Sequence, residues 1–106
     1  MSARRANATT NDGRLTSAAT VFAALGDETR LQLVQRLVAR GPLSIARLTQ
    51  GSNVTRQAVT KHLRVLARAG LARGSRQGRE SRWELAPLHI EEARRFLDLI
   101  TEPPQG

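Results

Sequence analysis

Residues 54–71 read VTRQAVTKHLRVLARAGL, and this stretch decides the fold. Thr55 can cap a helix that starts after it, and Gly70 can end one. Between these residues apolar side chains recur at i, i+4 and i+7, which predicts a helix from Arg56 to about Ala69 with one buried stripe. The stripe consists of Val59, Leu63 and Leu66.

The opposite side of this predicted helix is polar throughout. Its members recur at i, i+1, i+4, i+5 and i+8 and are Arg56, Gln57, Thr60, Lys61 and Arg64. They span about 12 Å at roughly 1.5 Å per residue, which is comparable to the roughly 12 Å width of the major groove of DNA. The pattern therefore favours a helix that enters this groove, and a solvent-facing side that happens to be basic is the alternative.

The residue types on this side suit the edges of base pairs. Gln57 can form two hydrogen bonds with adenine, and the methyl group of Thr60 can contact thymine. Arg56 or Lys61 can donate to guanine. Thr55 and the free amides of the first helical turn are placed to hold a phosphate group.

Three helices are predicted upstream of this one. An apolar run from Ala18 to Leu25 predicts a first helix that begins at Thr16 or Ser17 and ends at Gly26.

Asp27 can cap the second helix, which Gly41-Pro42 ends, and Ser44 can cap a short third helix that ends at Gly51. The second helix is expected to bury one face, made of Leu31, Val34, Leu37 and Val38.

Downstream, the pattern changes to two short strands. They are predicted over 71–76 and 81–85, with a turn at 77–80 between them. A last helix is expected to open at Pro87 and to end at Pro103-Pro104. Its apolar residues recur at helical spacing and are Ile90, Ala93, Leu97 and Ile100.

The order of these elements is α-α-α-α-β-β-α, a mainly α fold with a small β-hairpin. A helix-turn-helix followed by a hairpin is a winged helix-turn-helix. We expect residues 1–14 to be a disordered tail, 15–101 to form this domain with dimerisation helices at both ends, and 102–106 to be a C-terminal tail.

The predicted hairpin, or wing, is rich in arginine. Gly78 in its turn tolerates a positive φ, so the chain can reverse there. An arginine at a hairpin tip can enter a minor groove or hold the DNA backbone, which favours DNA contacts for Arg79 and Arg76. The alternative is an exposed loop that keeps these side chains in water. Trp83 is expected to anchor the wing on the core.

Charge is distributed unevenly along the chain. The 106 residues carry 17 Lys and Arg against 9 Asp and Glu, a net charge of +8, and Lys61 is the only lysine. The stretch 29–79 contains no acid, whereas the residues from Glu80 onward are mildly acidic. The basic middle predicts that this stretch binds a polyanion, double-stranded DNA. The acidic end is expected to have a different function.

Several other classes of protein are disfavoured. With no cysteine, the chain has no disulfide or thiolate chemistry, and we expect a cytoplasmic protein. No apolar run has the length of a membrane span, and no signal peptide is recognisable, so no membrane partner is expected. With His62 and His89 as the only histidines, no catalytic residues, metal site or cofactor are predicted, and the chain is not expected to be an enzyme.

Three segments together resemble a known family. FAALGDETRLQLVQRL at 22–37, the run at 54–71 and RQGRESRWEL at 76–85 are similar to the ArsR-type winged helix-turn-helix regulators of bacteria, and the likeness covers about 18–100. The resemblance implies a homodimer that binds a palindromic operator and represses transcription. Its DNA contacts would fall on Thr55, Arg56, Gln57, Thr60, Lys61, His62 and Arg79. His62 lies beside the buried stripe, where a packed or backbone-bonded histidine is the more common alternative.

The resemblance also implies that the first and last helices form the dimer interface. The candidate interface residues are Val21, Phe22, Leu25, Ile90, Ala93, Leu97 and Ile100. The apolar stripe of the last helix supports this independently, because a chain this short can bury it against a second copy. Packing of the two helices within one protomer is the alternative, and both can hold together.

The chain lacks the cysteine pair of the metal-sensing members of this family, so it resembles the cysteine-free branch, and no effector is predicted. A metal-responsive repressor with a non-cysteine site remains one alternative, since His89 and Glu92 lie one turn apart. A winged-helix module that binds protein is another, although it predicts a less basic helix than the one at 56–69.

Overall fold

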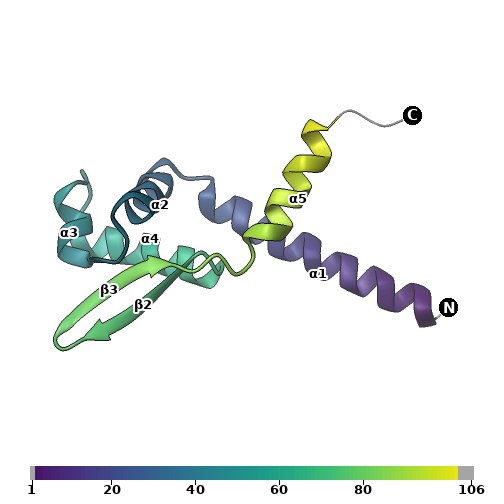
Figure 1. Cartoon of the computed structure of the whole chain (residues 1–106), viewed down its shortest axis with the longest axis horizontal. Helices are drawn as coiled ribbons and strands as arrows, with labels where there is room; N and C mark the ends of the chain where they lie inside the picture. The colour runs from purple at the N-terminus through teal and green to yellow at the C-terminus, as the bar shows by residue number, and fades with distance from the viewer. Residues whose placement is uncertain (1, 103–106) are drawn as a thin grey trace.

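The computed structural model describes the backbone of residues 2–102 and the side chains of residues 13–102. It confirms the predicted winged helix-turn-helix, with five helices and a small sheet among the described residues (Figure 1). The elements are α1 (Ser2–Leu25), α2 (Glu28–Arg40), β1 (Leu43–Ser44), α3 (Ile45–Gln50), α4 (Arg56–Arg68), β2 (Ala72–Gln77), β3 (Glu80–Leu85) and α5 (Ile90–Thr101).

Three helices begin at the capping side chains that the sequence predicts. The Asp27 carboxylate accepts a hydrogen bond from the backbone amide of Arg30 at 3.0 Å. The hydroxyls of Ser44 and Thr55 accept in the same way from the amide three residues further on. These side chains satisfy amides that have no partner inside the helix, so they fix where α2, α3 and α4 start. Gly41 ends α2 with a φ of 73°.

Helix α4 lies at the centre of the core. Its stripe of Val59, Leu63 and Leu66 is fully buried, as predicted. The other core residues come from all four remaining helices and from the start of the hairpin: Val21, Ala24, Leu33, Leu37, Leu48, Ala69, Leu71, Ala72 and Ala93. Truncating a core leucine typically costs about 2–5 kcal/mol, so this packing holds α4 firmly in place.

The strands form one antiparallel sheet in the order β1-β3-β2. Gln77 pairs with Glu80, which leaves Gly78 and Arg79 as a two-residue turn. Gly78 has a φ of 63°, a conformation that glycine adopts without strain. The sequence does not predict β1, which spans two residues and pairs with β3. It ties the start of α3 to the wing.

The predicted start of the first helix is wrong. Helix α1 begins at Ser2 instead of Thr16 or Ser17 and runs through most of the predicted tail at 1–14. Once the C-terminal half of a helix is fixed by packing, each further residue adds one backbone hydrogen bond, and no proline interrupts 2–14. Residue 1 and residues 103–106, including Pro103-Pro104, lie outside the described residues.

The start of the last helix is also wrong, because α5 begins at Ile90 and not at Pro87. The amide of Ala86 donates to the carbonyl of Leu71 at 2.9 Å, and that of Leu88 donates to Gly70 at 3.0 Å. These bonds hold 86–88 against the end of α4 and the start of β2.

The inward face of α2 differs from the prediction in part. Leu37 is buried and Val34 half-buried, but Leu31 and Val38 are exposed, and Leu33 is buried in their place. Besides α1, which directly precedes it, α2 contacts α4 and β3, which lie far from it in sequence. The choice among its apolar residues is therefore made by tertiary packing.

Helices α1 and α5 project from the rest of the molecule and pack against each other (Figure 1). The radius of gyration is 16.8 Å, whereas a compact chain of this length would have about 13 Å. The projecting pair accounts for this extended shape.

Candidate nucleic-acid interface

The predicted polar side of α4 faces solvent. Arg56, Gln57, Lys61 and Arg64 are exposed and Thr60 is half-buried, and all five line one shallow hollow. We call these five residues the polar face of α4. The buried stripe on the other side of the helix fixes its orientation. The structure therefore brings five of the six predicted helix contacts that follow Thr55 onto one surface.

Two hydroxyls at this end of α4 have partners inside the helix. The hydroxyl of Thr55 accepts from the amide of Ala58 at 3.1 Å, and that of Thr60 donates to the carbonyl of Arg56 at 2.9 Å. Since its hydroxyl is engaged, Thr60 offers an outside partner chiefly its methyl group.

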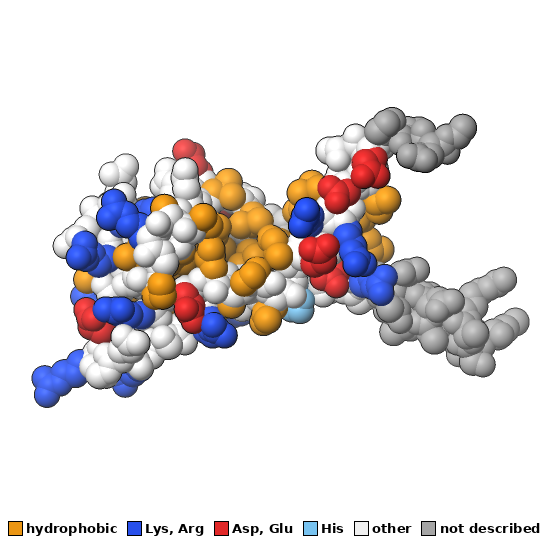
Figure 2. Space-filling model, in the orientation of Figure 1, with side chains coloured by type: hydrophobic (Ala, Val, Ile, Leu, Met, Phe, Trp, Pro, Cys, Tyr) orange, Lys and Arg blue, Asp and Glu red, His pale blue; other side chains and the backbone are white. Residues whose placement is uncertain are grey.

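The wing joins the polar face of α4 in one basic surface. A hollow of about 330 Å³ lies between the two, lined on the helix by Thr60 and Arg64 and on the wing by Arg76 among others. Basic side chains stand out at the end of the hairpin in Figure 2. Arg76 and Arg79 are exposed and form no ion pair with the described residues.

Two other wing arginines are partly neutralised by acids of the same hairpin. Arg73 forms an ion pair with Glu84 at 2.8 Å, across the two strands. Arg82 lies 3.9 Å from Glu80. The uncompensated charge of the wing therefore concentrates toward its tip.

His62 lies away from the polar face of α4. Its ring is half-buried, and its Nδ1 atom is 3.2 Å from the Nη1 atom of Arg30 and 3.9 Å from the Oδ2 atom of Asp27. The backbone amide of Arg30 donates to the Asp27 carboxylate and lowers the pKa of Asp27, and the charge of the Arg30 guanidinium lowers it further. His62 is thus the one predicted contact of α4 that the structure places in a different environment.

Arg68 is a further basic residue of α4 and is not among the contacts predicted from the sequence. It lines a hollow together with Lys61 and Arg64, one turn beyond the polar face of α4. Its spacing of i+4 from Arg64 is the signal that could have identified it.

The predicted interface residues of α1 and α5 divide into two groups. Val21 and Ala93 are buried within the protomer, and Phe22 packs edge-to-face on Phe96 with 6.4 Å between ring centroids. Leu25 is half-buried. In contrast, three residues of α5 are exposed as a second copy would require: Ile90, Leu97 and Ile100.

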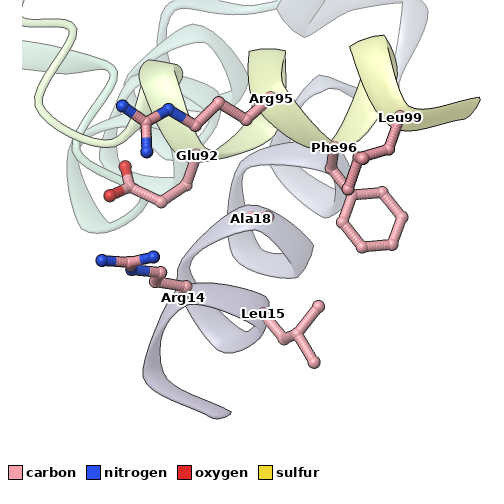
Figure 3. Close-up of a pocket in the computed structure, with 7 residues that line it drawn as sticks. All are labelled: Arg14, Leu15, Ala18, Glu92, Arg95, Phe96 and Leu99. Atoms are coloured by element: carbon pink, nitrogen blue, oxygen red, sulfur yellow. The ribbon is translucent and has the colours of Figure 1, made fainter. Parts of the chain in front are cut away.

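Three further apolar side chains near this region are exposed, and the sequence analysis does not name them: Leu15, Phe96 and Leu99. They line a hollow of about 340 Å³ between α1 and α5, with Arg14, Glu92 and Arg95 at its rim (Figure 3). For Phe96 and Leu99, the pattern that could have identified them is that α5 is apolar on more than one side.

Among residues 13–102, whose side chains the structure describes, no group of three or more His, Asp or Glu side chains is placed to hold a metal ion. His89 lies against Gly70, where a Cβ atom would come within 2.6 Å of the imidazole Cδ2. None of the described helices is long and apolar enough to cross a membrane.

Residues 25–74 match a family model described as a helix-turn-helix domain. An uncharacterized HTH-type transcriptional regulator of Bacillus subtilis, YuzN, is 40% identical over 65 residues, which cover 56% of this chain and 71% of the relative.

Two solved structures share the fold. An ArsR-like transcriptional regulator from Rhodococcus sp. RHA1 superimposes with a TM-score of 0.71 at 36% identity, over 83% of this chain and 82% of that one. The homodimeric winged helix-turn-helix DNA-binding domain Mb0332 from Mycobacterium bovis gives 0.65 at 24% identity, over 81% and 76%.

Proposed function

The chain belongs to the ArsR-type family of winged helix-turn-helix regulators, and from this we propose that it is a homodimeric repressor of a palindromic operator. It is a DNA-binding regulator and not an enzyme. The observation that carries the proposal is the exposed polar face of α4. The opposite side of this helix is a fully buried stripe, and the helix lies in a stretch of 51 residues without an acid.

We propose that the polar face of α4 reads bases in the major groove. Gln57 suits adenine, Arg56 or Lys61 suits guanine, and the methyl group of Thr60 suits thymine. Arg64 continues the face by one turn. Thr55 and the N-terminal amides of α4 would hold a phosphate, because the end of the helix carries partial positive charge.

The wing contributes contacts that do not depend on sequence. Arg79 in the turn and Arg76 beside it would meet the DNA backbone or the minor groove. Their lack of ion pairs among the described residues supports this role, since no acid has to be displaced first.

Dimerisation would use the projecting pair α1 and α5. The apolar side chains of α5 are exposed in the protomer, and so is the hollow between α5 and α1 (Figure 3). A second copy would bury both. The related domain from Mycobacterium bovis is homodimeric, which supports the same assembly here. Two copies would present two α4 helices to two half-sites about 34 Å apart or a multiple of it.

The charge pattern separates this proposal from a module that binds other proteins. A protein-binding surface of this kind is generally depleted of charge at its centre, whereas the polar face of α4 has three cations and no acid. We place this action in the cytoplasm, as expected for a cysteine-free DNA-binding protein.

Selection of bound fragments from random duplex DNA tests the proposal. We expect a palindromic consensus, and binding that weakens with salt at a log–log slope of about −0.9 for each phosphate neutralised. Enrichment of a single half-site by a monomeric protein would contradict the homodimer. Absence of any consensus would contradict sequence-specific reading.

Two variants then separate base reading from backbone contact. Gln57→Ala should relax the preference at particular base pairs by about 1–3 kcal/mol. Arg79→Ala should weaken binding to all sequences and reduce the salt slope by about 1. Gln32→Ala, an exposed glutamine on α2, serves as the control. If both test variants bound operator and random duplex like the control, the two assignments would be wrong.

A further inference from the structure

His62 stands where three helices meet. At about 100° per residue, it lies roughly 170° around α4 from the middle of the polar face. Its side chain is 22% exposed, and its Nδ1 atom faces the first turn of α2. This position gives His62 a poor approach to the groove that the polar face of α4 enters.

The hydrogen bond between His62 and Arg30 has only one possible direction. A guanidinium group has donors and no acceptor, and it stays protonated in proteins. The Nη1 atom of Arg30 therefore donates to Nδ1 of His62 at 3.2 Å. In this contact Nδ1 is the acceptor, which corresponds to the tautomer with its proton on Nε2.

Arg30 also holds the end of α1. Its Nε atom donates to the carbonyl of Ala24 at 2.6 Å, and its Nη2 atom donates to the carbonyl of Ala23 at 3.3 Å. These carbonyls belong to the last turn of α1, where the amides of the helix itself run out, and the carbonyl of Ala23 also accepts from the amide of Gly26 at 3.3 Å. One guanidinium group thus joins the C-terminus of α1 to α4 through His62.

We propose that His62 is a positioning residue that sets the orientation of α4 relative to α1, and thereby the distance between the two DNA-reading helices of a dimer. The proposal rests on the homodimer proposed above, since α1 would lie at its interface. His62 acts through Arg30 and makes no contact with DNA.

The surroundings of His62 are consistent with this role. Asp27, 3.9 Å from Nδ1, caps α2 and is itself bonded to the amide of Arg30, so the first turn of α2 is fixed where it meets α4. The remaining charged groups lining the hollow beside His62 are Lys61, Arg64 and Arg68. None of these three cations can accept the hydrogen bond of Arg30, so His62 is the acceptor on α4 that this junction uses.

The tautomer can be measured in the unmodified protein. Nitrogen-15 NMR of the two histidines should show His62 with a protonated Nε2 and an unprotonated Nδ1 at pH near 8, above the ordinary histidine range. The His62→Asn variant assigns the signal. A His62 ring with its proton on Nδ1 would overturn the contact with Arg30, and with it the proposal.

Two substitutions separate positioning from DNA contact. In His62→Asn the amide oxygen can occupy the place of Nδ1 and accept from Arg30, whereas in His62→Gln the polar atoms reach only the place of Nε2. Each variant is bound to the selected palindrome and to a duplex with one half-site, with thermal unfolding as the check on folding.

We expect His62→Asn to bind both duplexes within about threefold of the parent. His62→Gln should lose on the order of tenfold on the palindrome, the loss expected for a hydrogen bond to a charged group. Its affinity for the single half-site should stay within about threefold, and its salt slope should not change. The preferred half-site spacing should also become broader.

The opposite pattern would overturn the proposal. If His62→Gln kept its affinity while His62→Asn lost it on both duplexes, His62 would be a DNA contact through Nε2. If neither variant changed binding, the junction would have no influence on α4. An unmodified protein that bound the half-site as tightly as the palindrome would instead contradict the homodimer itself, before any variant is compared.

Discussion

At the scale of single residues, Asp27 shows how one side chain combines two functions. Its carboxylate caps α2 by accepting the amide of Arg30, and it lies beside His62. The hydrogen bond from Arg30 and the neighbouring positive charge favour the ionised form, so the pKa of Asp27 lies below its ordinary value of 3.8.

This lowered pKa predicts how stability depends on pH. The Asp27 carboxylate stabilises the folded chain above its unfolded pKa, and this contribution is lost as the pH falls through the lower folded pKa. Asp27→Asn should therefore be less stable than the parent at pH 7, and the difference should shrink below about pH 4.

Urea unfolding at both pH values measures the change, and Asp98→Asn on α5 is the control. A difference between Asp27→Asn and the parent that stayed constant with pH would contradict the electrostatic explanation.

The residues that could be predicted from the sequence are those whose partners are near in the chain. The caps Asp27, Ser44 and Thr55 bond to amides three residues further on, so local pattern identified them. The contact of Arg30 with His62 spans 32 residues. No periodicity contains such a contact, and the DNA contact of His62 is implied by the family resemblance alone.

At the scale of elements, the wing depends on a close approach between its two strands. Gly74 pairs with Trp83, and a Cβ atom on Gly74 would lie 3.2–3.3 Å from three atoms of the indole ring. The Nε1 atom of Trp83 is buried without a hydrogen-bond partner among the described residues. The indole ring is therefore held by its packing against Gly74 and not by a hydrogen bond among the described residues.

We predict that Gly74→Ala destabilises the fold by about 1–3 kcal/mol, because the added methyl group overfills the contact. Trp83 is the only tryptophan, so its fluorescence reports the displaced ring directly. Gly13→Ala is the matched control: nothing lies within 4 Å of its Cβ position in α1, and it should stabilise the helix by up to about 1 kcal/mol. Equal effects of the two substitutions would contradict this explanation.

Some helices and strands could be predicted from the sequence more accurately than others. Helices α2, α3 and α4 and the hairpin were predicted close to their observed bounds, because caps, glycines and a strong apolar period mark them. The start of α5 at Ile90 depends on hydrogen bonds from 86–88 to residues at the end of α4. Strand β1 exists only through its pairing with β3, so its two residues carry no pattern of their own.

At the scale of the whole molecule, the basic surface is separated from most of the exposed apolar side chains. The basic surface covers α4 and the wing, whereas exposed apolar side chains gather on α5, where Figure 2 shows them beside acidic ones. The sequence predicted this separation from its acid-free stretch, and it named three of the five exposed apolar residues of α5. It missed Phe96 and Leu99 because a single helical stripe was expected on α5.

This separation predicts that the oligomeric state can be changed without loss of the fold. Ile100→Glu should shift a dimer toward monomer by at least tenfold in its dissociation constant, because a charge would have to be buried at the interface. Val38→Glu on α2 is the matched control, since both residues are 67% exposed. Analytical ultracentrifugation measures both. If the two variants dimerised equally, α5 would not form the interface.

Lys61 gives the molecule an unusual chemical property. It carries the only side-chain amine, and it lies on the polar face of α4, while the other Lys and Arg positions are all arginine. Guanidinium groups do not react with acylating reagents under mild conditions, so among the side chains an acetyl group, or a fluorophore, would be directed to the polar face of α4. A single acylation would thus remove a positive charge there and leave the arginines of the wing untouched.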